Sequence, residues 1–100
     1  MESVYEKCLA HELETRAVPV KRQVTAPIQY GDFRIEAGLR MDLVVGGEVI
    51  VEVKSMDRLS PIHQAQLFTY LKLSGLKIGL LINFNVTYIK NGLRRVVLTQ

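Results

Sequence analysis

The stretch RMDLVVGGEVIVEVKS, residues 40–55, is expected to form a hairpin that carries charged side chains within its strands. Two runs rich in Val, Leu and Ile flank a Gly-Gly pair, a pattern that is typical of a β-hairpin. Each run also carries charged side chains, Asp42 in the first and Glu52 and Lys54 in the second. Because buried strands usually hold apolar side chains there, these three residues raise the question of whether they have a chemical role.

The length of the turn decides which side chains of the two strands face each other. A two-residue loop would mix charged and apolar side chains on each face of the hairpin. A three-residue loop over residues 46–48 pairs Val45 with Val49 and sets Asp42 opposite Glu52. Glycines suit the left-handed conformation that such loops need. We therefore predict the three-residue loop or an equivalent bulge.

This register would hold two carboxylates on one face, with Cβ atoms about 5 Å apart. Like charges so close are destabilising unless positive charge balances them. Lys54 and Arg40 supply part of it, and a divalent cation such as Mg²⁺ would supply more. A solvent-facing surface with a salt bridge is the alternative. The other face of the hairpin would then build the core through apolar residues, namely Met41, Leu43, Val45, Val49, Val51 and Val53.

Composition places the chain among globular proteins of one domain, residues 1–100. It has 100 residues, 48% hydrophobic and 23% charged, with a net charge of +3. No apolar run reaches the roughly 18 residues of a membrane span, and no leader resembles a signal peptide. The single cysteine, Cys8, has no disulfide partner. We expect a cytoplasmic protein without a membrane partner.

The remaining patterns predict a mixed sheet flanked by helices, in the order α-β-β-β-α-β-β. Pro27 places one strand at a sheet edge, Ser60 and Pro61 begin a helix, and Asn91-Gly92 is a strong hairpin signal. The expected helices cover residues 2–17 and 61–74. The expected extended segments cover residues 20–30, 33–36, 40–45, 49–54 and 78–83, with a last hairpin over 86–98.

Three motifs in this order resemble the PD-(D/E)xK nuclease superfamily. They are Asp42, the E-x-K of residues 52–54 and the Q-x-x-x-Y of residues 66–70, which is similar to the QxxxY branch. The resemblance extends to the GxxExxY family of that superfamily and covers nearly the whole chain. It is carried by residues 2–5, 12–13, 38–43, 63–67 and 79–85.

Two departures from the family pattern stand out. The leading glycine of GxxExxY would lie before Met1, so the chain is expected to be shortened at its start. Met41 stands where the superfamily name has proline.

The resemblance implies an α/β (α+β) fold with a restriction-endonuclease-like core. It also implies that Asp42, Glu52 and the Val53 carbonyl hold Mg²⁺ or Mn²⁺. Lys54 would then activate the attacking water or stabilise the transition state. The other expected site residues are Gln66 and Tyr70, with Glu12, preferred over Glu2, as a ligand from the first helix. A solvated helix position is the alternative for both glutamates.

The implied activity is hydrolysis of nucleic-acid phosphodiester bonds, with DNA favoured over RNA. Four basic residues are expected to hold the nucleic-acid backbone, namely Arg40, Lys90, Arg94 and Arg95. The alternative is a non-catalytic member of the same fold that binds nucleic acid or protein. A homodimer is compatible with either interpretation. For His63 we expect an ordinary surface or helix-start role rather than a contact with phosphate.

Overall fold

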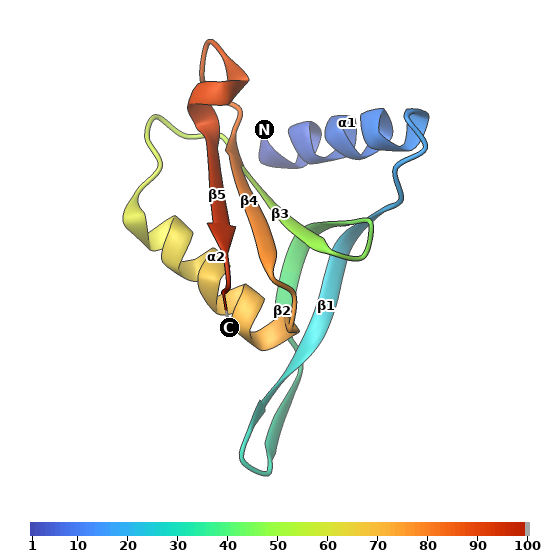
Figure 1. The fold of residues 1–100 in the computed structure, drawn as a ribbon, viewed down its shortest axis with the longest axis vertical. Helices are drawn as coiled ribbons and strands as arrows, with labels where there is room; N and C mark the ends of the chain where they lie inside the picture. Colours follow the sequence, from blue (N-terminus) through green and yellow to red (C-terminus); the bar gives the residue numbers. More distant parts are fainter. Residues whose placement is uncertain (100) are drawn as a thin grey trace.

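The computed structural model describes residues 1–99 and confirms the order α-β-β-β-α-β-β. Its sheet has the strand order β1-β2-β3-β4-β5 (Figure 1). Strands β3 and β4 run parallel, and the other neighbours run antiparallel. The elements are α1 (Glu2–Thr15), β1 (Val20–Tyr30), β2 (Phe33–Val45), β3 (Val49–Lys54), α2 (Pro61–Ser74), β4 (Ile78–Asn83), the 3₁₀ helix η1 (Ile89–Gly92) and β5 (Leu93–Val97).

Helix α2 forms the crossover that the parallel pair β3 and β4 requires. It begins with a capping box, in which the Ser60 N–H donates to Nδ1 of His63 at 3.1 Å, and Pro61 is its first residue. It ends at Gly75, whose φ of 80° satisfies the left-handed cap. The predicted helix-start role of His63 is therefore confirmed.

Both faces of the sheet are covered by a helix, and each has its own apolar cluster. Ile50 and Leu81 pack with α2, whereas their chain neighbours Val51 and Ile82 pack with α1. The prediction of a single core face was therefore wrong, because a sheet containing a parallel crossover buries both sides. The α2-side cluster comprises Leu39, Met41, Val44, Ile50, Leu67, Leu71 and Leu81, and the α1-side cluster comprises Ala10, Leu43, Val51, Val53 and Ile82.

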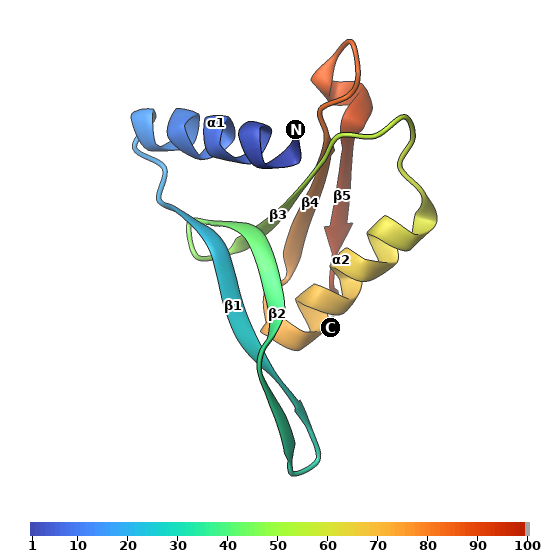
Figure 2. The same cartoon turned by 180° about the vertical axis from the view of Figure 1, so that it is seen from behind.

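The β1–β2 hairpin is longer than the sequence predicted. The expected short strand at 33–36 continues past Gly38 into the Asp42 segment as one strand. Strand β1 lies at a sheet edge, and the register shifts between Ala26 and Ile28, around Pro27. The edge position predicted from Pro27 is therefore confirmed. The tip of the hairpin extends well beyond both helices (Figure 2).

The predicted hairpin around Asn91-Gly92 was wrong. These two residues belong to η1, and β5 pairs with β4. Gly92 serves close packing instead, because a Cβ built on it would lie 2.1 Å from the Asn83 carbonyl oxygen. No helix within residues 1–99 is long and apolar enough to cross a membrane.

Replacing Gly92 by Ala is expected to destabilise the protein by about 1–3 kcal/mol, because the added methyl group must displace backbone. Asn91→Ala, one residue away at an exposed position, is the matched control. Urea denaturation measures both variants. Equal stability of Gly92→Ala and Asn91→Ala would contradict this account of the turn.

Candidate metal and phosphodiester site

The turn that positions the candidate site is the predicted three-residue loop. Val45 pairs with Val49, and the Glu48 N–H donates to the Val45 carbonyl at 3.1 Å. Gly46 and Gly47 both have positive φ, 61° and 70°, which explains the glycine pair. The register prediction is confirmed over the pairs that follow, up to Leu43 with Val51.

Beyond that last pair, carboxylates replace main-chain groups between β2 and β3. The Asp42 N–H donates to Oε2 of Glu52 at 2.8 Å, and the Val53 N–H donates to Oδ2 of Asp42 at 2.9 Å. Each carboxylate thus holds the backbone of the other strand. The strands separate at this point, and the two acids are fixed side by side in the gap.

Each carboxylate keeps one oxygen free. Among residues 1–99, Oδ1 of Asp42 and Oε1 of Glu52 accept no hydrogen bond, and every buried side-chain nitrogen or oxygen has a partner. Both free oxygens therefore retain contact with solvent, although the Glu52 residue is only 8% exposed. Paired oxygens of this kind suit Mg²⁺, which binds one or two carboxylates and keeps several waters.

Two further groups of β3 lie at the same gap. In an extended strand the N–H and C=O of one residue point to the same neighbour. The Val53 carbonyl therefore points toward β2, as its N–H does. Lys54 is half-buried, and its positive charge acts on the Glu52 carboxyl. The donor set thus comprises two carboxylates and a carbonyl, beside one ammonium group.

Burial raises the pKa of the Glu52 carboxyl from 4.5 to about 7. The negative charges of Asp42 and Glu6 add to this increase. The hydrogen bond from the Asp42 N–H and the charge of Lys54 oppose it. The site therefore lacks positive charge, which a divalent cation would provide.

Helix α2 brings the Q-x-x-x-Y pair to the carboxylates. Nε2 of Gln66 donates to the Tyr70 hydroxyl at 3.0 Å. Burial raises the pKa of Tyr70, and so do the charges of Glu52 and Asp42, whereas the Arg40 charge lowers it. The charges of the carboxylates and of Arg40 therefore act at the Tyr70 hydroxyl. The structure thus brings together five residues predicted from sequence, namely Arg40, Asp42, Glu52, Lys54 and Tyr70. Gln66 is bonded to Tyr70.

A family model described as the PD-(D/E)XK nuclease superfamily matches residues 1–96. The chain belongs to the PD-(D/E)XK nuclease superfamily. The five-stranded mixed sheet with its helices is consistent with the restriction-endonuclease-like fold of this superfamily. No curated protein and no solved structure matches the chain significantly.

The glutamates of α1 lie differently from the prediction. Glu12 bonds within its own helix, to Thr15 and to Arg16 at 3.4 Å, so the structure does not bring it to the carboxylate pair. Glu2 accepts the Ser55 N–H at 3.1 Å. The helix carboxylate whose charge acts on Glu52 is that of Glu6.

Sequence reasoning missed Glu6, which is 3% exposed. Nothing in its immediate neighbours distinguishes it from the other glutamates of α1. The available signal is its position four residues before Ala10, since residues four apart share one face of a helix. Ala10 belongs to the α1-side cluster, so this face is the one that packs on the sheet.

The basic residues divide between the two faces of the sheet. Arg94 pairs with Leu81, which pairs with Glu52, so these three form one row across the sheet. Paired side chains share a face, which places Arg94 on the α2 side, about 10 Å from the Glu52 strand. Arg95 pairs with Leu80 and therefore points to the α1 side. Lys90 lies in η1, and Nη1 of Arg94 bonds to main-chain carbonyls nearby.

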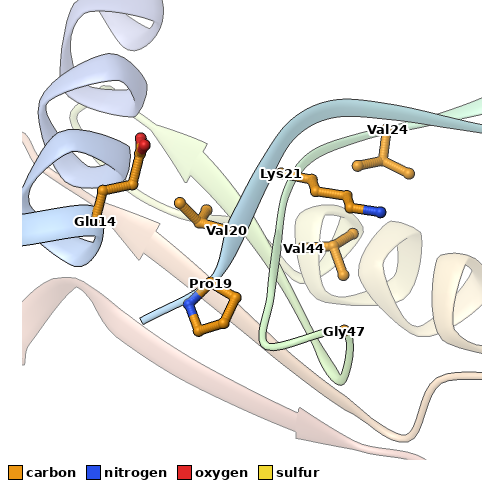
Figure 3. A pocket seen from close by; sticks show the side chains of 7 residues that line it. All are labelled: Glu14, Pro19, Val20, Lys21, Val24, Val44 and Gly47. Carbon is orange, nitrogen blue, oxygen red and sulfur yellow. The ribbon is translucent and has the colours of Figure 1, made fainter. Parts of the chain in front are cut away.

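No group of three or more His, Cys, Asp or Glu side chains that could hold a metal lies within residues 1–99. In this superfamily member, two carboxylates would therefore have to be completed by the Val53 carbonyl, water or phosphate oxygens. One hollow of the described surface lies elsewhere and has about 430 Å³ (Figure 3). It is lined by Glu14, Pro19, Val20, Lys21, Val24, Val44 and Gly47, none of them a predicted site residue.

Proposed function

We propose that this chain is a metal-dependent phosphodiesterase that hydrolyses DNA or RNA, with its site at Asp42 and Glu52. The observation that carries the proposal is the pair of carboxylates, each fixed by a backbone N–H of the opposite strand and each with one oxygen open to solvent. Superfamily membership supports a nucleic-acid substrate.

In this proposal Asp42, Glu52 and the Val53 carbonyl hold Mg²⁺ or Mn²⁺. The cation would neutralise charge on a phosphate oxygen and lower the pKa of a water. Lys54 adds positive charge where negative charge develops in the transition state. Tyr70, oriented by its bond to Gln66, borders the substrate. Glu12 is not carried into the proposed ligand set.

Within the superfamily we assign the chain to the GxxExxY family. Its E-x-x-Y residues, Glu2 and Tyr5, both support the site region. Glu2 accepts the N–H of Ser55, the residue after Lys54. The Tyr5 ring stacks on Phe84 at 4.8 Å, which joins the start of α1 to the end of β4. Both contacts hold the start of α1 at the C-terminal ends of β3, which carries Glu52, and β4.

Replacing Arg94 by Ala is expected to weaken nucleic-acid binding about tenfold, because Arg94 lies in the Glu52 row on the same face. The loss of one phosphate contact should also reduce the number of counterions released on binding by about one, which lowers the slope of log affinity against log salt concentration. Arg95→Ala removes the same charge from the opposite face and is the matched control. Fluorescence anisotropy at several salt concentrations measures both, and equal losses would contradict the assignment of the binding face.

The activity is tested with labelled single-stranded DNA, duplex DNA and RNA in Mg²⁺, in Mn²⁺ and in EDTA. Cleavage that needs the metal and disappears in Asp42→Asn is expected. Binding of nucleic acid without cleavage in either metal would favour the non-catalytic alternative. The homodimer and the cytoplasmic location stay predictions from sequence, and light scattering tests the first.

A further inference from the structure

Gln23 has a backbone conformation that is unusual for its residue type. It lies within β1, yet its φ is 52°, in the left-handed region that favours glycine. Residues held in such conformations persist when surrounding contacts enforce them, and they concentrate at functional sites. Contacts made by Gln23 are therefore expected to enforce its positive φ.

The side chain of Gln23 is anchored to the buried carboxylate of Glu6. Nε2 of Gln23 donates to Oε1 of Glu6 at 2.7 Å, while Nε and Nη2 of Arg22 contact Oε2 at 3.0 and 2.9 Å. Both carboxylate oxygens are thus bound by adjacent residues of β1. Helix α1 fixes the strand at the residue with the positive φ.

The residue opposite Gln23 is Asp42. Arg22 pairs with Leu43 and Val24 with Met41, so the register is unbroken, but the pair between them is missing from the ladder. Asp42 also lies one residue beyond the last β2–β3 pair. It is therefore outside both ladders, at the level where Gln23 leaves the β conformation.

The β1–β2 ribbon changes faces at this level. Met41 packs in the α2-side cluster and Leu43 in the α1-side cluster, although residues two apart in a strand normally share a face. Strand β1 changes in the same way, since Val24, the partner of Met41, packs with the first cluster, whereas Val20, the partner of Val45, packs with the second. Figure 3 shows Val20 toward α1 and Val24 near Val44. The sequence prediction that Met41 and Leu43 share a face was therefore wrong.

This change of face explains the direction of the Asp42 carboxylate. In a regular strand a side chain stands roughly perpendicular to the sheet and does not reach the backbone of the next strand. Asp42 instead accepts the Val53 N–H across the gap. We propose that Gln23, held in its left-handed conformation by Glu6, is a positioning residue that turns the Asp42 carboxylate toward Val53 and so shapes the metal site. The inference rests on the proposed function for its metal.

The test compares three variants of β1. Gln23→Val disfavours positive φ, Gln23→Gly accepts it without strain, and Gln29→Val makes the same change at an exposed, regularly paired position as a control. We expect Gln23→Val to weaken Mn²⁺ binding about 10- to 100-fold, as loss of an outer-shell partner does. Gln23→Gly and Gln29→Val should bind Mn²⁺ within about threefold of the wild type, a smaller change than the loss of an outer-shell partner causes.

A second readout needs no metal. The Val53 amide proton, bonded to a carboxylate, should resonate downfield in the metal-free protein, and it should move upfield in Gln23→Val and in Asp42→Ala alike. An unmoved Val53 amide and unchanged Mn²⁺ affinity in Gln23→Val would overturn the inference. Equal losses in Gln23→Gly would overturn it too, because the side-chain bond and not the conformation would then matter.

The two proposals fail in different ways. A wild type that binds no Mn²⁺ contradicts the proposed function, while the Val53 amide still decides whether Gln23 positions Asp42. If Gln23→Val does not fold, Gln23→Leu, whose side chain also disfavours positive φ but has no β-branch, replaces it under the same expected results.

Discussion

Replacing Asp42 by Asn is expected to abolish metal-dependent cleavage of nucleic acid and to weaken Mn²⁺ binding at least about 100-fold, since even outer-shell partners contribute 10- to 100-fold. Asn keeps an oxygen that accepts the Val53 N–H, so the strands stay together. It loses the negative charge that a divalent cation requires. Isothermal titration measures the affinity, and a labelled substrate measures the cleavage.

The matched control is Glu12→Gln, which removes one carboxylate charge from α1. Glu12 bonds within its own helix, so both metal affinity and cleavage should stay within about twofold of the wild type. The loss of a residue that supports a metal site would cost about 10- to 100-fold. Full activity in Asp42→Asn would contradict the site. A large loss in Glu12→Gln would instead show that α1 supplies a ligand as first predicted from sequence.

Replacing Glu52 by Gln is expected to stabilise the metal-free protein at pH 8 by about 3 kcal/mol and to change nothing at pH 4. Because the pKa of Glu52 is raised from 4.5 to about 7, the folded protein binds more protons than the unfolded chain between these pH values. The stability of the wild type therefore falls as pH rises from 4.5 to 7 and stays lower above that. Gln keeps an acceptor for the Asp42 N–H without a charge.

Urea unfolding in EDTA between pH 4 and pH 8 measures this difference. Added Mn²⁺ should restore stability to the wild type at pH 8 and leave Glu52→Gln nearly unchanged, since a ligand stabilises only the state that binds it. A wild type whose stability relative to Glu52→Gln does not depend on pH would show that the buried carboxyl titrates normally.

The hairpin that carries the site could be predicted from sequence because several constraints agree there. Gly46 and Gly47 permit the three-residue loop, and only that loop separates charged from apolar side chains. The result places Asp42 beside Glu52, as the hydrogen bonds between their strands show. The α2 boundaries followed in the same way, from Ser60 and Pro61 at the start and Gly75 at the end.

Other features depend on contacts between distant segments and left no local pattern. Nothing around Gln23 indicates a positive φ, which requires the buried carboxylate of Glu6. The same bend moves Met41 and Leu43 to opposite faces, which strict alternation does not allow. Gly92 looked like a turn residue, but its lack of a side chain serves the approach of Asn83. Tertiary packing decided each case.

The most direct test of the central claim is a titration of the ¹⁵N-labelled protein with Mn²⁺, followed by paramagnetic broadening of its amide signals. We expect the signals of Asp42, Glu52, Val53 and Lys54 to broaden first, and Asp42→Asn to remove this effect. Broadening that begins elsewhere, for example at Asp32 and Glu36 of the exposed hairpin tip, or none at millimolar Mn²⁺, would contradict a metal site between β2 and β3.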